Sequence, residues 1–301
     1  MIPTYRREGV LVDTLRQVLA QDPPADEVLV VDQTPDAEHE AETLAFLRDQ
    51  AACGRIRWIR QFPANLPAAR NRALAETSCE IVIFIDDDVI LSPGFVAAHV
   101  ANYSDPRVTA VAGQILDSDR KTVSELPKPA RRRRFGWLHF PLNYDKRAFV
   151  VGGRGCNFSV RREAALAIGC FDPNYTGRAC REESDFFLRL GRAGGMCVFD
   201  PRASLVHIGW LPGGCNWVGW PQKGLMRSDD VACETYFWLK NYEPHVAAAA
   251  LVPAYARWFG KLLLRARPGL WPRGVASIMR GFVTGLARLW RTSARERTLP
   301  K

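Results

Sequence analysis

The stretch 80–88, which reads EIVIFIDDD, determines the fold class of this chain. Its first six residues are almost all β-branched or aromatic and show no polar alternation, which is typical of a strand covered on both faces. The stretch 27–32 (EVLVVD) repeats the pattern and also ends in an acid, Asp32. Because ligands of α/β sheets bind beyond the carboxyl ends of strands, both ends are candidate functional positions.

Helical and strand patterns alternate around these two stretches. Helices are predicted over residues 9–21, 36–50, 67–77 and 182–193, and a further helix opens at Ser92-Pro93, with Ser as the cap. Strands are predicted over 27–32, 55–60, 80–85, 156–160 and 203–207, with another from Phe149. The pattern predicts an α/β fold with a mostly parallel, Rossmann-like sheet.

Length and composition favour one large domain with an appendage. The chain has 301 residues, of which 47% are apolar and 24% charged. Its eight cysteines include no Cys-x-x-Cys pair, so zinc-site spacing is absent and free thiols are expected. No secretory signal is expected, and Ile2-Pro3-Thr4 has the pattern of a first strand whose earlier residues are missing.

The positive charge is concentrated in the C-terminal segment. Residues 240–301 hold twelve Lys or Arg and two acidic residues, a formal charge of +10, whereas the whole chain carries +9. A basic segment of this kind suggests phosphate-rich partners, either a membrane surface or nucleic acid.

The three consecutive acids predict a metal site. On extended backbone, residues i and i+2 point the same way, so Asp86 and Asp88 share one side. Two carboxylates suit Mg²⁺ or Mn²⁺ held together with substrate phosphates, and the metal would neutralise a departing diphosphate. The sequence has no phosphate-binding glycine motif, which argues against a P-loop NTPase and a nicotinamide enzyme.

Six short motifs follow one another in a recognisable order. They are residues 2–7 (IPTYRR), 30–32 (VVD), 65–71 (NLPAARN), 86–88 (DDD), 152–159 (GGRGCNFS) and 182–185 (EESD). In this order they resemble the family-2 glycosyltransferases, which are inverting enzymes with the GT-A fold. The resemblance covers roughly residues 1–210.

The resemblance implies a role for each matching position. Asp32 would contact the nucleotide base, usually uracil, and Asp86 and Asp88 would meet the ribose, diphosphate and metal. The implied nucleotide-sugar contacts are Pro3, Thr4, Tyr5, Arg7, Asp32, Arg70, Asn71, Asp86 and Asp87. The implied loop near donor sugar and acceptor contains Gly153, Arg154, Gly155 and Asn157.

The catalytic base is expected among three acids of one helix. Deprotonation of an attacking sugar hydroxyl by a placed carboxylate accelerates transfer by roughly 10²–10⁴-fold. The resemblance assigns the base to the second acid of the pair, Glu183, although the family usually has Asp there; Glu182 and Asp185 stay as alternatives. Without the motif order, these would be ordinary first-turn acids favoured by the helix dipole.

Three further features have more than one interpretation. His207 follows a short apolar strand, and it either completes the metal shell with Asp86 and Asp88 or ends the strand as an ordinary edge histidine. Trp210, Trp217 and Trp220 lie in a glycine-rich loop that either closes over the sugars or packs under C-terminal helices. Arg131–Arg134 lie in a loop that is either solvated or mobile and near an anionic ligand or a lipid surface.

The C-terminal segment predicts two basic amphipathic helices, over residues 246–265 and 273–295. The apolar face expected on the first consists of Leu251, Tyr255, Trp258, Phe259 and Leu262. The apolar face expected on the second consists of Val275, Ile278, Met279, Phe282, Val283, Leu286, Leu289 and Trp290. Neither has the roughly 18–20 apolar residues needed to span a bilayer, so peripheral attachment is favoured. The alternative is that both helices pack on the catalytic domain with their arginines in water. The apolar faces are too extensive for a nucleic-acid-binding segment, so no nucleic acid partner is expected.

The sequence therefore predicts a catalytic domain over residues 1–228, with a nucleotide-binding half (1–115) and an acceptor half (116–228), and a helical region over 229–301. The expected enzyme is cytoplasmic and peripheral at the inner face of the membrane. It would transfer a sugar, from UDP in the first instance, to a glycan or lipid-linked acceptor. The alternatives are a sugar-nucleotide nucleotidyltransferase, whose Gly-rich opening is absent, and a degenerate membrane-bound scaffold.

Overall fold

The computed structural model describes residues 1–126, 140–210, 213–216 and 223–298, with side chains as far as Thr292. The strands are β1 (Ile2–Thr4), β2 (Leu29–Asp32), β3 (Arg57–Arg60), β4 (Ile81–Ile85), β5 (Val89–Leu91), β6 (Val108–Leu116), β7 (Ala148–Val150), β8 (Asn157–Arg161) and β9 (Met196–His207). The helices are α1 (Glu8–Leu19), α2 (Ala41–Ala52), α3 (Leu66–Glu76), α4 (Phe95–Val100), α6 (Arg162–Ala167), α7 (Glu182–Arg192), α8 (Ser228–Asn241), α9 (Pro244–Arg265) and α10 (Trp271–Thr298).

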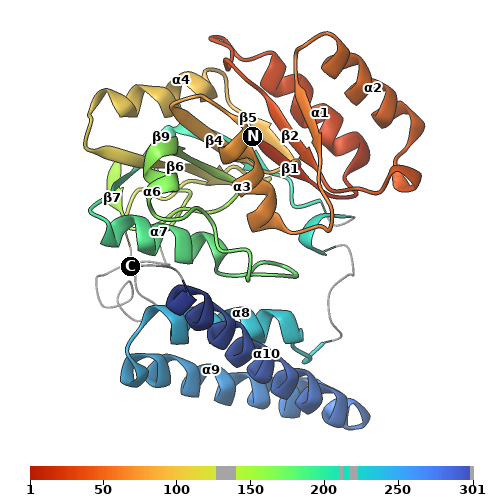
Figure 1. The fold of residues 1–301 in the computed structure, drawn as a ribbon, viewed down its shortest axis with the longest axis vertical. Helices are drawn as coiled ribbons and strands as arrows, with labels where there is room; N and C mark the ends of the chain where they lie inside the picture. Colours follow the sequence, from red (N-terminus) through yellow and green to blue (C-terminus); the bar gives the residue numbers. More distant parts are fainter. Residues whose placement is uncertain (127–139, 211–212, 217–222, 299–301) are drawn as a thin grey trace.

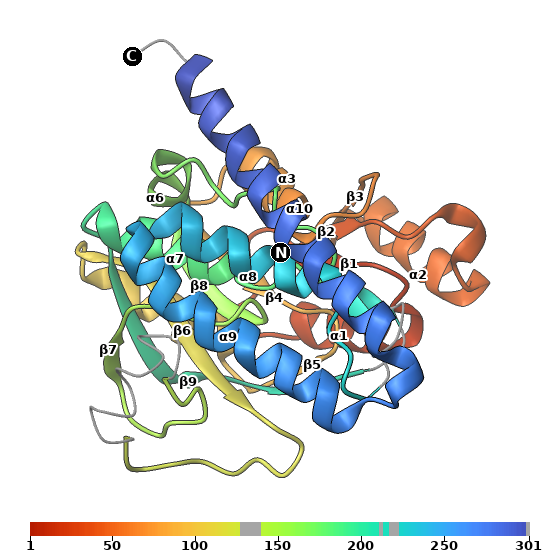
Figure 2. The same ribbon diagram turned by 90° about the horizontal axis from the view of Figure 1, so that it is seen from below.

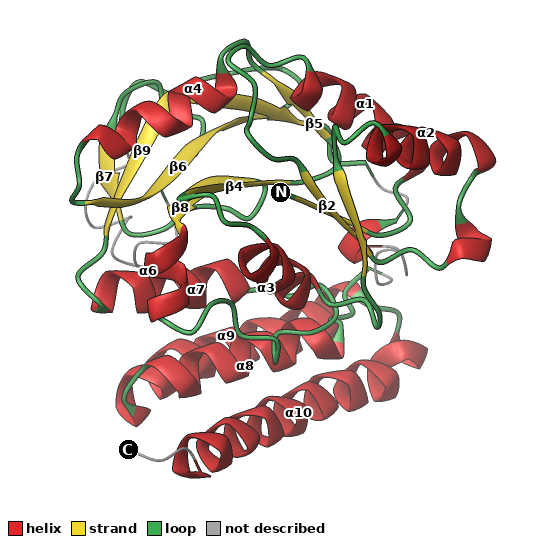
Figure 3. Ribbon diagram, turned by 45° about the horizontal axis from the view of Figure 1, so that its top comes forward, coloured by secondary structure: helices red, strands yellow, loops and turns green. Residues whose placement is uncertain are grey.

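The strands form two neighbouring sheets between layers of helices (Figures 1 and 3). The first is parallel, in the order β1-β2-β3, and the second runs β4-β8-β6-β9-β5, with β7 beside β9. β1 lies next to β4, because the amino group of Met1 donates to the Ile83 carbonyl at 2.8 Å and Ile85 N donates to Met1 O at 3.2 Å. The ends of β1, β2 and β4 therefore lie close together.

The α/β class is confirmed, and the parallel arrangement holds for the first sheet. In the second sheet β6 and β9 are parallel, whereas the β4–β8, β6–β8, β5–β9 and β7–β9 pairs are antiparallel. The parallel pair of this sheet, β6 and β9, is joined by a long connection that contains α6 and α7, as a parallel crossover requires.

Several predicted elements have different bounds. The helix expected over 36–50 is a short 3₁₀ turn at Asp36–Glu38 followed by α2. The helix expected to open at Ser92-Pro93 begins at Phe95, after Gly94 with a φ of 68°. The chain first makes a turn there, and glycine takes the left-handed conformation without steric cost. The strand expected over 203–207 is the end of the twelve-residue β9.

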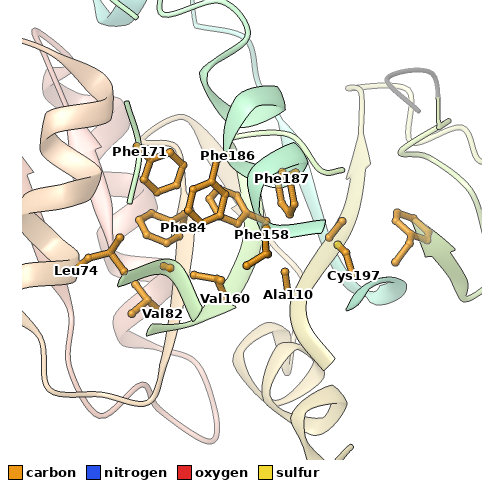
Figure 4. Close-up of a cluster of buried hydrophobic side chains, with 14 of the residues drawn as sticks. Leu74, Val82, Phe84, Ala110, Phe158, Val160, Phe171, Phe186, Phe187 and Cys197 are labelled. Carbon is orange, nitrogen blue, oxygen red and sulfur yellow. The ribbon is translucent and has the colours of Figure 1, made fainter. Parts of the chain in front are cut away.

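An aromatic core fixes helix α7 on the second sheet (Figure 4). Phe84 of β4 stacks on Phe158 of β8 with ring centroids 4.7 Å apart, and Phe171 stacks on Phe186 of α7 at 4.0 Å. Phe187 meets Phe158 edge to face at 5.3 Å. Because α7 is held by two adjacent aromatic side chains, the position of its first turn relative to the strand ends is well defined.

Helices α8, α9 and α10 form a layer beneath α7 and α3 (Figures 1 and 2). Ion pairs join α8 to the segment before α7: Arg181 Nε lies 2.6 Å from Glu234, and Arg178 lies 3.3 Å from Asp230. No helix in the described part of the chain is both long and apolar enough to cross a bilayer.

Candidate active site

Three potential metal ligands meet at the carboxyl end of β4. Asp86 and Asp88 lie in the turn between β4 and β5, and β5 pairs with β9 so that Val89 is opposite His207. This pairing places His207 Nε2 3.3 Å from Asp88 Oδ1 and 3.9 Å from Asp86 Oδ2. One ligand atom from each of the three residues lies within 4.8 Å of the others. The strand register thus brings together residues more than a hundred positions apart.

The arrangement around Asp88 fits a bound cation. Its Oδ2 accepts a hydrogen bond from Trp210 N at 2.8 Å and lies 3.3 Å from Arg7 Nη1. Its Oδ1 is buried and has no hydrogen-bond donor among the described residues. A buried carboxylate oxygen without a partner is costly, and a cation would relieve that cost. Two carboxylates and one imidazole are a suitable donor set for a divalent transition ion.

The charges of the site support the same interpretation. The Asp88 carboxylate, 3.3 Å from the imidazole, raises the pKa of His207, whereas burial opposes that rise. Burial raises the pKa of Asp86, and repulsion from Asp88 adds to the effect. Carboxylates that repel one another in this way gain from a cation placed between them.

Asp87 points away from this group, as expected for the middle residue of three. Its side chain is buried and lies 3.7 Å from Arg7 Nε, while its carbonyl accepts a hydrogen bond from Thr14 Oγ1 at 2.9 Å. Burial raises the pKa of Asp87 to about 8. Asp87 therefore connects the turn to β1 and α1, and Arg7 bridges it to Asp88.

Glu182, the first acid of α7, is paired inside the protein. Arg70 of α3 forms an ion pair with Glu182 Oε1, and its Nη2 donates to Gly155 O at 3.1 Å. The guanidinium also lies over the rings of Phe158 and Phe171, with centroid distances of 5.8 and 5.5 Å. Burial lowers the pKa of Arg70. The pair joins α3, the glycine loop and α7.

Asp185, the third candidate acid, has several protein partners as well. Arg189 Nε lies 2.8 Å away, Lys240 Nζ 2.9 Å and Asn241 Nδ2 2.8 Å, and the carboxylate is fully buried. Since Lys240 and Asn241 belong to α8, Asp185 ties α7 to the C-terminal helical layer. This carboxylate is occupied by protein cations and amides.

Glu183 is the acid of the three that faces open space. It is half-buried and lines a cavity of about 610 Å³, together with Asp117, Asn143, Gly153, Arg154, Arg181 and Ser184. Neither Glu182 nor Asp185 lines this cavity. A carboxylate at the wall of a cavity can reach a hydroxyl group of a bound molecule.

The predicted nucleotide segment lies at the ends of β1 and β2. Pro3 and Thr4 are in β1, opposite Val31 and Asp32, and Thr4 O accepts a hydrogen bond from Gln33 N at 3.0 Å. Tyr5 O accepts one from Gly214 N at 2.7 Å. These contacts hold the loop after β1 against the segment that follows His207.

Asp32 has more protein partners than the sequence indicates. Its Oδ1 accepts from Thr34 N at 2.8 Å, and its Oδ2 accepts from Trp58 Nε1 at 3.0 Å and lies 2.9 Å from His39 Nε2. Arg60 Nη1 is 3.7 Å away. His39, Trp58 and Arg60 were not predicted. Trp58 and Arg60 reach Asp32 because β3 pairs with β2, with Trp58 opposite Val30. The strand predicted over 55–60 was the sequence feature that could have pointed to these two residues. A base contact at Asp32 requires one of these partners to move.

Asn71 and Asn157 have structural positions rather than open ones. The Asn71 amide donates to Phe171 O and accepts from Phe171 N, both at 2.8 Å. Asn157 is fully buried; it contacts His99 Nε2 at 2.9 Å and donates to Gln114 O at 2.8 Å and Ala203 O at 3.0 Å. The Asn157 side chain points into the sheet and joins β6, β8 and β9, and the placement of the loop Gly153 to Asn157 near the sugars stays a prediction.

The remaining loop residues border the cavity or support it. A Cβ added to Gly153 would lie tightly against the Phe187 ring, at 3.0 Å, and one on Gly155 would collide with the buried Arg70 guanidinium, so Gly155 is the position that needs glycine. Arg154 is exposed and lines the cavity. The Trp210 ring is half exposed, while its backbone bonds Asp88 and Arg7. Trp217, Trp220 and Arg131–Arg134 lie outside the described residues.

The family of this chain follows from its similarity to known proteins. The model of glycosyl transferase family 2 matches residues 1–169, more than half of the chain. This chain belongs to glycosyl transferase family 2. The matched region is therefore a glycosyltransferase family 2 domain, and the predicted family and enzyme class are confirmed for it.

Relatives of this glycosyltransferase agree with the family. The succinoglycan biosynthesis protein ExoM of Rhizobium meliloti (strain 1021) is 29% identical over 204 residues, which cover 66% of this chain and 63% of ExoM. S. aureus TarS 1–349, solved with UDP-GlcNAc, aligns with a TM-score of 0.61 and 12% identity over all of this chain and 92% of that one. The Pyrobaculum calidifontis mannosyltransferase PcManGT, solved with GDP-Man and Mn²⁺, gives 0.55 and 20% identity, covering 99% and 79%. The GT-A fold is thereby confirmed.

Proposed function

We propose that this glycosyltransferase moves a sugar, with inversion, from a nucleoside-diphosphate donor to a hydroxyl group of a glycan or lipid-linked acceptor. The observation that carries the proposal is the position of Glu183. It faces the 610 Å³ cavity, whereas Glu182 and Asp185 are held by protein partners. One carboxylate at the acceptor side is sufficient for a single displacement, because no covalent intermediate has to form.

The proposed reaction is one displacement at the anomeric carbon. The acceptor hydroxyl donates its proton to the Glu183 carboxylate as its oxygen forms the new bond. The bond from the anomeric carbon to the diphosphate oxygen breaks, and the diphosphate leaves with the electron pair. Arg154, exposed at the same cavity, is placed to attract the phosphate charge.

Asp86, Asp88 and His207 would hold a divalent ion, and we favour Mn²⁺ over Mg²⁺ because imidazole is a poor ligand for Mg²⁺. The ion would neutralise charge on the leaving diphosphate. The Mn²⁺ named for PcManGT supports this choice.

We propose UDP as the carrier and polysaccharide assembly as the setting. UDP-GlcNAc is named for TarS, GDP-Man for PcManGT and succinoglycan biosynthesis for ExoM. We also propose that the acceptor is lipid-linked and that the enzyme lies at the cytoplasmic face of the membrane. That location rests on the exposed apolar and basic side chains of the C-terminal helices.

Calorimetry combined with a transfer assay tests the proposal. We expect at least one of UDP-, GDP- and dTDP-sugars to bind, more tightly with Mn²⁺ than without it. Glu183→Gln keeps the shape and removes the base, so donor binding should persist while transfer falls by roughly 10²–10⁴-fold. Glu163→Gln is the matched control, because Glu163 is an exposed first-turn acid of α6.

Two results would contradict the proposal. If none of these nucleotides binds in the presence of Mn²⁺, the donor assignment is wrong. If Glu183→Gln transfers sugar as fast as the Glu163→Gln control, Glu183 is not the base.

A further inference from the structure

The C-terminal helices expose an apolar surface that differs from the one indicated by their sequence pattern. In α9 the predicted apolar face packs inward: Leu251, Trp258 and Leu262 are buried, and Tyr255 and Phe259 pack against the same cluster. In α10 the predicted face divides. Ile278 is buried, whereas Val283 is 60% exposed and Trp290 70% exposed. The inward-facing side chains join the helices to each other and to α8.

A second set of apolar side chains faces outward. On α10 they recur every three or four residues and so follow one side of the helix. They are Val275, Met279, Val283, Leu286 and Trp290 on α10, with Val246, Val252, Leu263 and Leu264 on α9. We call this set the outer apolar face. Leu264 is 87% exposed and Val252 67%, so no described part of the chain covers them.

Basic side chains accompany the outer apolar face. From residue 244 to residue 292 the chain has eight Lys or Arg and no acidic residue. Arg288 is buried, where it donates to Thr176 Oγ1 at 2.6 Å. The other seven are exposed, and none forms an ion pair with a described residue: Arg257, Lys261, Arg265, Arg267, Arg273, Arg280 and Arg291.

The exposed basic side chains lie beside the outer apolar face, an arrangement that suits an interface better than a fully solvated surface. In α9, Arg257, Lys261 and Arg265 recur every four residues and form one row beside the outward apolar residues. Figure 2, seen from below, shows α9 and α10 extending side by side across this end of the molecule. A broad apolar surface rimmed by unpaired cations is unusual on a soluble monomer.

The geometry points to an anionic lipid bilayer as the occupant of the outer apolar face. Helices lying in the plane of a membrane bury an apolar side and place Lys and Arg near lipid phosphates. Each such cation near an anionic surface strengthens the attachment, because it is attracted to the lipid phosphates. A second copy of this chain is a poorer fit, because the same unpaired cations would face one another across a two-fold interface.

This inference is independent of the proposed sugar transfer, since it rests on α9 and α10 alone. It would bring the enzyme to the surface where a lipid-linked acceptor resides. Neither helix spans the bilayer, so the attachment is peripheral and sensitive to salt.

Vesicle flotation of the full chain tests the inference. We expect flotation with vesicles of phosphatidylcholine mixed with phosphatidylglycerol, and at least tenfold weaker binding to phosphatidylcholine alone. Val283→Asp combined with Leu264→Asp should weaken binding to anionic vesicles at least tenfold. Val100→Asp is the matched control, because Val100 is an exposed valine at the end of α4, on the opposite side of the molecule (Figure 1).

The basic side chains are tested separately. Arg257→Glu with Lys261→Glu should reduce anionic-vesicle binding at least tenfold, whereas Arg48→Glu with Arg55→Glu changes the net charge equally at exposed positions in and after α2. Thermal unfolding of each variant should match that of the wild type, because every substituted residue is exposed.

Three outcomes would overturn the inference. The first is that the Val283→Asp/Leu264→Asp variant floats with anionic vesicles as strongly as the Val100→Asp control. The second is that the wild type binds neutral and anionic vesicles equally. The third is that the wild type forms a concentration-dependent dimer, which the Val283→Asp/Leu264→Asp variant dissociates while vesicle binding is unchanged. The last outcome would assign the face to a second copy of this chain.

Discussion

The three acids in the first turn of α7 differ in what they contact. Glu182 is paired with Arg70 and Asp185 with Arg189 and Lys240, whereas Glu183 faces the cavity. Adjacent positions on a helix point about 100° apart, so neighbouring carboxylates of similar chemistry meet different surroundings. At this scale, function depends on direction as much as on residue type.

A second single-residue effect concerns His99, which lies on α4 and faces β8 of the second sheet. It contacts Ser159 Oγ and Asn157 Oδ1, both at 2.9 Å, and it is fully buried. Burial lowers its pKa from 6.5 to about 4. The folded protein therefore holds His99 neutral at pH values where the unfolded chain protonates it.

The lowered pKa of His99 predicts that the folded protein loses stability as the pH falls. Between pH 6.5 and 4 the unfolded chain binds a proton at His99 that the folded protein does not bind. The contribution of His99 to the free energy of unfolding is therefore fully present above pH 6.5 and is lost as the pH falls towards 4. The shift amounts to about 3 kcal/mol. In urea titrations across this range, His99→Gln should lose that part of the pH slope, whereas His245→Gln, at an exposed position, should keep it. An unchanged slope in His99→Gln would contradict the assignment.

Among the elements, α10 shows how small residues permit close helix packing. Gly274, Gly281 and Gly285 are buried on the side that faces α8 and α9. A Cβ on Gly281 would lie 2.5 Å from Val231 Cβ and 2.6 Å from Ser228 O of α8. The helices are therefore closer there than any side chain allows.

Gly281→Ala should consequently destabilise the protein, because α10 must move away from α8. We expect a loss of about 1–3 kcal/mol in the free energy of unfolding. Gly260→Ala in α9 is the control: its Cβ meets nothing within 4 Å, so better helix propensity should add about 0.5–1 kcal/mol. Chemical denaturation measures both. Equal effects of the two substitutions would refute the close packing of α8 and α10.

At the scale of the whole molecule, the ion pairs of Lys240 join the catalytic layers to the C-terminal helical layer. Lys240 Nζ of α8 lies 2.9 Å from Asp185 of α7 and 2.7 Å from Asp172 in the preceding loop. One cation thus serves two buried or nearly buried carboxylates. The C-terminal helices support the helix that carries Glu183, in addition to any contact they make with a membrane.

Lys240→Met should therefore weaken both stability and catalysis. Removing one partner of a buried ion pair costs about 3–5 kcal/mol, and a less constrained α7 should lower kcat more than it raises KM. Thermal unfolding should remain a single transition at a lower Tm. Lys223→Met, at an exposed position before α8, should leave Tm and kcat unchanged. Two separate transitions in the wild type would show that the layers do not unfold together.

Much of the fold followed from local pattern. The runs ending at Asp32 and Asp86 are β2 and β4, and the helices expected over 9–21, 67–77 and 182–193 differ from α1, α3 and α7 by at most two residues at each end. Helix and strand periodicity, caps and strand-end acids are properties of neighbouring residues, so they can be interpreted without knowing what packs against them. The family resemblance, confirmed by the match over residues 1–169, depends on the chain alone in the same way.

The remaining features of the fold and of the candidate site depend on contacts between residues far apart in the sequence. Arg70 and Glu182 are 112 residues apart, Asp185 and Asn241 56 apart, and His207 reaches Asp88 through the pairing of β5 with β9. Which acid faces the cavity, which groups surround Asp32 and which side of α9 faces outward all depend on such contacts. Periodicity identifies an apolar face but not its partner, because burial is decided by the surface that packs against it.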